Sequence, residues 1–456
     1  MIGSTSQALS LLRATARTDG QVATASMATV GGSPVERDVS KLKDARQLLR
    51  DQFFAESQLG TVNLPSGPDE AAARASGTAP VSKTNSAEIA RLKEKVAGYT
   101  KALNRLMALK PMPDAPHATL VVGFRNASGG VTLSISGQHV AGVYTRPDVP
   151  RPVEMHRWDP ELADQVGIQA ETVDSVYTGG GRDTVAITAD RVDSVYTGNE
   201  GDAVVIVARQ ASSLYLDSEG SADTPYRPGN DALAVSANFI DNVYGGAGDD
   251  ALALRGDVVQ SVFGDEGQDA ITITAGLVEQ ISGGDGDDAL VVDAEVGGSV
   301  LNNLTYMDMI GDAKAGDPAV AATRWATMPA DVDGGAGNDA ISLRVGTALQ
   351  ARGGYGDDSF AIAGGGTAAL IYGEGEGHDT VTLDRSSTAV VCIQGGKGRY
   401  EVEQGEDSLT IRMANGSAVT FLGLSTSGTI AVTSVGSTKE PTLLWEGRQT
   451  TLDRTA

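Results

Sequence analysis

A glycine-rich turn that ends in an aspartate recurs along this chain, and its spacing constrains the fold more than any other feature. The aspartates that end these turns are Asp183, Asp202, Asp231, Asp250, Asp269, Asp288, Asp339, Asp358 and Asp379. Successive members are 19 residues apart, except for intervals of 29 before Asp231, 51 before Asp339 and 21 before Asp379. A fixed period of this kind is the signature of a repeat architecture.

Each repeat has two halves with different apolar patterns. Directly after the aspartate, small and large apolar residues alternate, as in ALAL at 251–254 and AITI at 270–273. This alternation predicts a strand with one buried face. The second half has two apolar residues three positions apart, such as Val259 and Val262. That spacing is wrong for a flat strand and predicts a short, bent one.

Stacked repeats of this kind predict a mainly β protein, namely a parallel β-solenoid similar to a β-roll or β-helix, with coils of about 19 residues. Stacking would place each turn aspartate above the next. Neighbouring carboxylates then repel by roughly 1 kcal/mol in water, and by more when they are partly buried. Ca²⁺ between successive turns would reverse that repulsion, because it binds hard oxygen ligands in flexible geometry. Glycine turns offer backbone carbonyls as further ligands.

The turns resemble the calcium-binding nonapeptide GGxGxDxUx of the RTX repeat family, which is found in secreted bacterial toxins and hydrolases. Four segments match it fully: GGAGDDALA (245–253), GGDGDDALV (283–291), GGAGNDAIS (334–342) and GGYGDDSFA (353–361). A fifth, GDEGQDAIT at 264–272, departs only at the second glycine. The resemblance implies that carbonyls and the aspartate of each turn bind calcium between successive turns.

The residues expected to bind calcium on this basis, with the aspartate of the last turn added, are Gly245, Gly246, Gly248, Asp250, Gly264, Gly267, Asp269, Gly283, Gly284, Gly286, Asp288, Gly334, Gly335, Gly337, Asp339, Gly353, Gly354, Gly356, Asp358 and Asp379. An RTX coil usually carries two nonapeptides, whereas each repeat here has one, so we expect one calcium column rather than two. The turns before Asp183, Asp202 and Asp231 fit the pattern poorly, which leaves open that their sites are empty. Tyr400 replaces the aspartate in GGKGRY and is expected to mark the end of metal binding.

Composition shifts divide the chain into five regions. These are a mobile segment at 1–37, an α-helical hairpin or coiled-coil region with a linker at 38–112, and a β-hairpin cap region at 113–165 whose two strands are expected at 120–124 and 131–136. They are followed by the solenoid at 166–400, with inserts near 217–229 and 296–333, and by a C-terminal β cap with a possible export signal at 401–456. The heptad-spaced helix at 85–109 pairs either within the chain or with a second copy in a homo-oligomer.

Charge and composition limit the partners. A net charge of −24 opposes binding to nucleic acid. No apolar run approaches the ~20 residues needed to cross a bilayer, and the N-terminus lacks the apolar core of a cleavable signal peptide. The single cysteine, Cys392, lies in an apolar run and is expected to be buried.

The function indicated is that of a secreted or cell-surface calcium-binding protein with a structural or adhesive role, whose partner would be a cell-surface polysaccharide or another surface protein. The RTX resemblance implies type I export without a cleaved signal peptide. The last insert, with Tyr306, Met307, Met309 and Trp325, is interpreted as a structural flap, or alternatively as a partner site.

Two alternatives remain open. One is a carbohydrate-active enzyme resembling polysaccharide lyases or epimerases, with Asp308, Asp312 and Arg324 at a groove under the insert. The other is an appendage protein exported by a flagellar-type route. The four histidines are scattered, and no nucleophile elbow or zinc-protease motif occurs. The sequence therefore offers no catalytic constellation, although it does not exclude an enzyme.

Overall fold

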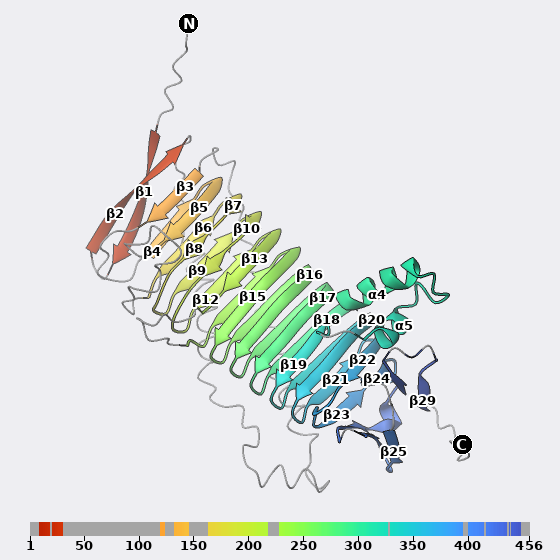
Figure 1. The fold of residues 1–456 in the computed structure, drawn as a ribbon. Helices are drawn as coiled ribbons and strands as arrows, with labels where there is room; N and C mark the ends of the chain where they lie inside the picture. The colour runs from red at the N-terminus through yellow and green to blue at the C-terminus, as the bar shows by residue number, and fades with distance from the viewer. Residues whose placement is uncertain are drawn as a thin grey trace, which may run out of the picture. The chain divides into compact units, whose positions relative to one another are not determined.

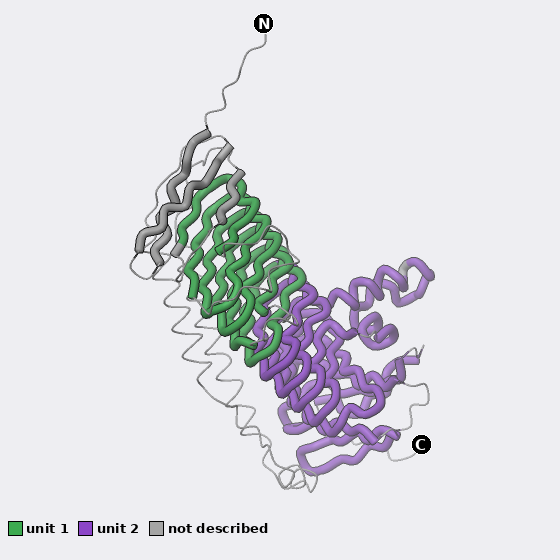
Figure 2. The backbone as a smooth tube through the Cα atoms, turned by 60° about the vertical axis from the view of Figure 1, so that its left-hand side comes forward, with its two compact units in different colours: residues 1–63, 93–256 green, residues 64–92, 257–456 purple. Residues whose placement is uncertain are grey.

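The computed structural model describes residues 9–18, 21–30, 119–123, 132–145, 163–217, 228–326, 329–394, 400–414, 416–435, 437 and 439–447. The chain divides into two compact units (Figure 2). Unit 1 comprises Met1–Asn63 and Lys93–Gly256, and unit 2 comprises Leu64–Leu92 and Asp257–Ala456. Both consist mainly of β-strands in parallel pairs, so the prediction of a mainly β protein is confirmed.

Unit 1 contains strands β1 to β15. Their bounds are β1 Leu9–Thr18, β2 Gln21–Val30, β3 Thr119–Gly123, β4 Thr132–Ser136, β5 His139–Tyr144, β6 Gln165–Gln169, β7 Thr172–Val173, β8 Val176–Tyr177, β9 Thr184–Thr188, β10 Arg191–Val192, β11 Val195–Tyr196, β12 Ala203–Val207, β13 Gln210–Tyr215, β14 Ala232–Ser236 and β15 Phe239–Ala247. Strand β16, Ala251–Glu266, contains the boundary between the units.

Unit 2 contains the remaining strands, two α-helices and a 3-10 turn. Their bounds are β17 Ala270–Asp285, β18 Ala289–Gly297, α4 Gly298–Met309, α5 Pro318–Arg324, β19 Val332–Ala336, β20 Ala340–Tyr355, β21 Ser359–Ala363, β22 Thr367–Tyr372, β23 His378–Leu383, β24 Thr388–Ile393, β25 Tyr400–Gln404, β26 Ser408–Met413, β27 Ala418–Leu422, η2 Leu424–Thr426, β28 Thr429–Ser434 and β29 Thr442–Trp445.

Strand pairing follows the repeat of the sequence. In unit 1, β12 lies between β9 and β14, so that Val204 is beside Val185 on one side and Leu233 on the other. In unit 2, β18 pairs with β17 and places Leu290 beside Ile271. All five side chains are fully buried. The alternating apolar residues after each aspartate therefore form the interior of each unit, and each aspartate stands at the start of a buried strand.

The second half of the repeat is bent in β13, β15, β16 and β17, as the spacing of the apolar residues there predicts. In each of these strands a non-glycine residue at the bend has a positive φ angle, with values of 59° at Ser213, 55° at Asn242, 54° at Ser261 and 57° at Gln280. A left-handed residue interrupts the in–out alternation of a strand. As a result Val278 and Ile281, which flank the bend at Gln280, both point into the interior and are fully buried.

The structure differs from prediction at the N-terminal side of unit 1. Instead of a mobile segment over 1–37, β1 and β2 form an antiparallel pair from Leu9↔Val30 to Thr18↔Gln21. Strand β1 also pairs with β4, because the edge of a sheet offers backbone groups to a further strand. The α-helical region predicted for 38–112 lies outside the described residues.

The β-hairpin predicted from strands 120–124 and 131–136 is wrong. Both strands exist, but β3 pairs in parallel with β5, and β4 pairs in parallel with β6. Parallel pairing buries Leu133 and Ile135 beside Val166 and Ile168. The two strands thus adopt the parallel pairing of the repeats that follow them.

The insert near 296–333 folds onto unit 2 as α4 and α5, which lie alongside β20, β22 and β24 (Figure 1). Met307 and Ala322 of these helices belong to one buried apolar cluster with Ala348 of β20, Ala369 of β22 and Cys392 of β24. Small side chains on successive strands give the helices room to approach. This packing supports the interpretation of the insert as a structural flap, and the burial of Cys392 is confirmed.

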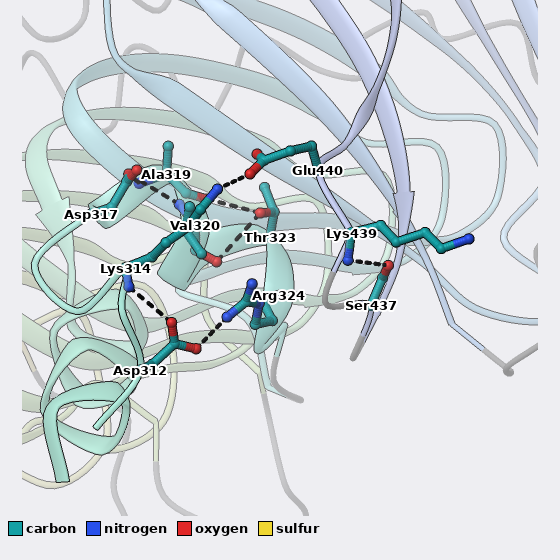
Figure 3. A network of polar contacts seen from close by, with 10 residues as sticks. All are labelled: Asp312, Lys314, Asp317, Ala319, Val320, Thr323, Arg324, Ser437, Lys439 and Glu440. Atoms are coloured by element: carbon teal, nitrogen blue, oxygen red, sulfur yellow. Dashed lines mark hydrogen bonds and ion pairs between the residues drawn. The ribbon is translucent and has the colours of Figure 1, made fainter. Parts of the chain in front are cut away.

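Polar contacts fix the loop between the two helices (Figure 3). Asp312 pairs with Arg324 at the end of α5, and Lys314 pairs with Glu440 near the C-terminus. Asp317 caps α5, because its Oδ1 accepts from two amides of the first turn at 3.1 and 3.3 Å. The loop is therefore attached to both the insert and the C-terminal segment.

The parallel repeat continues past the boundary predicted at residue 400. Strand β27 pairs in parallel with β23, and β28 pairs in parallel with β24. Strands β25 and β26 form an antiparallel pair, and β29 pairs antiparallel with β28. The described part of the C-terminal region, for which a β cap is predicted, thus consists mainly of β-strands. The export signal stays a prediction.

Candidate metal column

The glycines of the turns are required by the backbone. In the turn that begins at Gly334, Gly335 has a φ of 114° and Gly337 a φ of 144°, which residues with a side chain rarely adopt. A Cβ at either position would also collide with a carbonyl of the preceding turn, at Gly284 and Gly286 respectively. The glycines at the second and fourth positions of the motif are therefore explained by the fold alone.

Asp265 stands where the other matching turns have their second glycine. It adopts a φ of 77°, a left-handed conformation that aspartate tolerates better than most residues. The single departure of GDEGQD from the motif therefore preserves the shape of the turn. Burial raises the pKa of Asp265, and the neighbouring Glu266 raises it further.

The turn aspartates form a hydrogen-bonded column in each unit. The backbone N–H of each aspartate donates to Oδ1 of the aspartate in the following turn. In unit 1 these bonds, of 2.6–2.7 Å, join Asp164, Asp183, Asp202, Asp231 and Asp250. In unit 2 bonds of 2.8–2.9 Å join Asp269, Asp288, Asp339, Asp358 and Asp379. Every one of these side chains is buried.

The sequence analysis did not include Asp164, which is the first member of the column in unit 1. It lies 19 residues before Asp183 and is followed by the alternating segment QVGIQ of β6. The period alone would have found it. No glycine-rich turn precedes Asp164 in the sequence to mark it as a member of the repeat. The residues before 163 lie outside the described part of the chain.

The second carboxylate oxygen sets the column apart from an ordinary hydrogen-bonded ladder. Oδ2 is buried and has no hydrogen-bond partner at Asp231, Asp339 and Asp358. At Asp339 this oxygen lies against Gly334, the first glycine of the same turn, together with the carbonyl oxygen of Gly353 from the next turn. A Cβ on Gly334 would collide with both oxygens. The first glycine thus leaves a space into which two oxygen atoms converge.

The same arrangement recurs along unit 2. Next to Gly264 lie Oδ2 of Asp269 and the carbonyl of Gly283, and next to Gly283 lie Oδ2 of Asp288 and the carbonyl of Gly334. Converging carboxylate and carbonyl oxygens are the donor set that Ca²⁺ prefers. The residues present therefore fit calcium.

Backbone carbonyls would have to supply most of the ligands. Within the part of the chain that the structure describes, no group of three or more His, Cys, Asp or Glu side chains lies close enough together to hold a metal ion. Each turn contributes one carboxylate to the buried column. A site between two turns would therefore be completed by carbonyls of the glycine-rich segments.

Electrostatics shows why bare carboxylates are unfavourable here. Burial raises the pKa of Asp339 to about 9, with Asp358 the next carboxyl to raise it. Burial likewise raises the pKa of Asp358 to about 7. Burial, followed by the charge of Asp217, also raises the pKa of Asp231 well above its usual value. A stack of such groups needs either protons or cations to stay folded.

Two of the three turns that fit the motif poorly, those before Asp183 and Asp202, have threonine in place of the first glycine. The hydroxyl of Thr178 donates to the carbonyl of Thr197 at 3.2 Å, and that of Thr197 donates to the carbonyl of Leu216 at 2.7 Å. Burial raises the pKa of Asp202 well above its usual value, and the neighbouring carboxyls of Asp183 and Asp231 raise it further. A side chain thus occupies the space that glycine leaves open in unit 2.

Asp379, at the C-terminal end of the column, differs from the other predicted ligands. The hydroxyl of Tyr372 donates to its Oδ2 at 2.7 Å, so this oxygen already has a partner. Burial raises the pKa of Tyr372 well above its usual value, which keeps the donor protonated. In the next strand Val419 pairs with Asp379 and ends the column. The sequence analysis missed Tyr372 because the longer interval of 21 residues before Asp379 obscures its position in the repeat.

Other residues to which the sequence analysis assigned a possible role are not members of the aspartate column. Tyr400, expected to mark the end of metal binding, begins β25, and the turn before it lies outside the described residues. Asp312 and Arg324, proposed for an enzyme groove, form an ion pair in the insert. The side chain of Asp308 is not among those described.

Comparisons with protein-family models, curated proteins and solved structures find no match to this chain. Among the residues described, no helix has both the length and the apolar character needed to cross a membrane.

Proposed function

We propose that this chain is a calcium-binding parallel β-solenoid with a structural or adhesive role, secreted or held at a cell surface. The parallel pairing of strands one repeat apart in each unit supports a solenoid. The observation that carries the calcium assignment is the buried Oδ2 of Asp339 and Asp358, which has no hydrogen-bond donor. In this proposal Ca²⁺ lies between successive glycine-rich turns.

Calcium would compensate the charge of the column. An isolated ionised carboxylate in a buried site is unfavourable unless it is paired or coordinates a metal. Backbone geometry explains why the turns contain glycine, but it does not explain why the column positions contain aspartate. An apolar residue such as Val419, which follows Asp379 in the column position, shows that the fold accepts a neutral side chain there.

The location follows from the same chemistry. A protein that binds calcium only when folded gains stability as the free calcium concentration rises above the dissociation constant. In this proposal the turns are weakly held at the low calcium of the cytosol and fold where calcium is millimolar, outside the cell. Folding after export would need no enzyme and no disulfide.

Two aspartates of one turn provide a matched test. Asp358 is buried in the column, whereas its neighbour Asp357 is partly exposed and accepts from the backbone N–H of His378 at 2.8 Å. The purified protein, freed of metal with a chelator, is titrated with Ca²⁺ by calorimetry, and its melting temperature is followed. Asp358→Asn should reduce the number of ions bound and the rise in melting temperature, while Asp357→Asn should leave both unchanged. Equal behaviour of the two variants, or no calcium binding by the parent protein, would refute the proposal.

A further inference from the structure

Unit 1 carries a second regular row of side chains, outside the aspartate column. Five tyrosines occupy equivalent positions in successive repeats: Tyr144, Tyr177, Tyr196, Tyr215 and Tyr244. Their ring centroids are 4.7–5.2 Å apart, and neighbouring ring planes are parallel within 7°. We call this row the tyrosine ladder.

The tyrosine ladder lies on the outside of unit 1. Val176 and Thr178, which flank Tyr177, are fully buried, whereas Tyr177 is partly exposed. The same alternation places Tyr196 outside, between buried residues. Since the ring faces cover one another, the ladder presents ring edges and hydroxyl groups to its surroundings. The interior packing is complete without these hydroxyls.

Each tyrosine hydroxyl can both donate and accept a hydrogen bond. Burial raises the pKa of Tyr177, and the neighbouring rings of Tyr196 and Tyr144 raise it further. Side-chain hydrogen bonds from Ser175 to Tyr177 and from Ser194 to Tyr196 add hydroxyl groups beside the ladder. The surface is thus a strip of regularly repeated hydroxyls beside aromatic edges.

The charges near the strip disfavour an anionic ligand. Asp174 and Asp193 lie close to it in the sequence of each repeat, and they pair with His139 at 2.6 Å and with Arg191. The pairing leaves no surplus of positive charge there, and the whole chain carries −24. A polyanion would be repelled, while an uncharged polyhydroxyl ligand would not.

We propose that the tyrosine ladder binds an extended, uncharged polysaccharide that lies along the row, with one sugar residue at each repeat. The sugar units of extended β-linked chains repeat at roughly the ~4.8 Å spacing of β-strands, so successive residues of such a polymer would meet successive tyrosines. A serine two positions earlier in the chain accompanies Tyr177, Tyr196 and Tyr215. Hydroxyl groups would exchange hydrogen bonds with the ligand, and the ring edges would add van der Waals contacts. Equivalent contacts repeated along one rigid row add affinity without further ordering of the protein.

The proposal is tested on the full chain in excess Ca²⁺, so that the turns are in their folded state. The probes are insoluble cellulose and chitin in pull-down assays, their soluble hexasaccharides in calorimetry, and alginate as an anionic control polymer. The triple variant Tyr177→Phe, Tyr196→Phe, Tyr215→Phe keeps the stacked rings and removes the central hydroxyls. Tyr306→Phe on α4, where the tyrosine is 48% exposed, is the matched control.

We expect the parent protein to bind at least one of the two neutral polymers and to leave alginate unbound. The triple variant should bind about tenfold more weakly or worse, with an unchanged melting temperature, whereas the control variant should bind as the parent does. The proposal is overturned if neither neutral polymer binds, if alginate is preferred, or if the triple variant binds like the parent. Calcium binding is measured on the same preparations, so that failure of the calcium proposal is distinguished from failure of this one.

Discussion

A glycine and an aspartate of the same turn have different physical reasons for their positions. Gly335 and Gly337 are fixed by positive φ angles and by the carbonyls of the preceding turn, which leave no room for a Cβ. Asp339 is fixed by a hydrogen bond from its neighbour in the column through Oδ1, while its Oδ2 has none. Only the aspartate therefore points to a ligand.

The first prediction concerns the close stacking of turns. Gly335→Ala should destabilise the protein by about 2 kcal/mol more than Gly365→Ala. Both glycines have positive φ angles, 114° and 90°, but only Gly335 faces a backbone carbonyl at the Cβ position. Urea unfolding followed by circular dichroism in calcium measures both differences. Equal losses would mean that the turns are not packed as closely as described.

At the same scale, the glycine-rich turns and their period predicted nine of the ten aspartates that form the columns of the two units, all except Asp164. They could not predict that each Oδ1 accepts from a backbone amide, because that bond depends on how far successive strands are staggered. Tyr372 also escaped prediction. Its hydroxyl donates a hydrogen bond to Oδ2 of Asp379. A local sequence pattern does not reveal which buried side chain reaches a carboxylate.

Among the elements, the strands were the most predictable and their partners less so. Alternation of small and large apolar residues identified β9, β12 and β14, although four consecutive residues of each strand are buried, on both faces. The strands β3 and β4 were also identified, but their pairing was not, because local alternation does not specify the neighbouring strand. The helices α4 and α5 have no repeat to reveal them, and their position depends on the small residues of β20, β22 and β24.

The second prediction concerns how the insert is attached. Met307 is fully buried in α4, and Met309, two residues later, is 78% exposed. Met307→Ala should lower the free energy of unfolding by about 2–5 kcal/mol, as expected for a buried side chain that leaves a cavity. Met309→Ala should change it by less than about 0.5 kcal/mol. A small effect at Met307 would show that the helices do not pack on the strands in solution.

For the whole molecule, the sign of the pH dependence follows from the column. The pKa values of Asp339, Asp379 and Asp358 are raised in the folded state to about 9, 8 and 7, mainly by burial. An unfolded aspartate titrates near ~3.9. Without metal, these groups contribute stability fully below the unfolded pKa, and that contribution is lost as pH rises through the folded values.

The third prediction is therefore that the melting temperature of chelator-treated protein falls between about pH 5 and about pH 9. Asp339→Asn should reduce this slope, because the amide does not titrate. Excess Ca²⁺ should raise the melting temperature most at the alkaline end, where the carboxylates are deprotonated and available as ligands. A metal-free melting temperature that rises with pH over this range would contradict the burial of the column.

The most direct measurement is the anomalous X-ray scattering of crystals grown with Ca²⁺ at a wavelength where calcium scatters anomalously. The account predicts anomalous peaks between successive glycine-rich turns of unit 2, in contact with Oδ2 of Asp288 and Asp339 and with carbonyls of their turns. No peak is expected at Asp379, whose Oδ2 accepts from Tyr372. Well-ordered turns without anomalous density, with the same carboxylates still buried, would contradict the calcium column and leave the glycine turns as architecture alone.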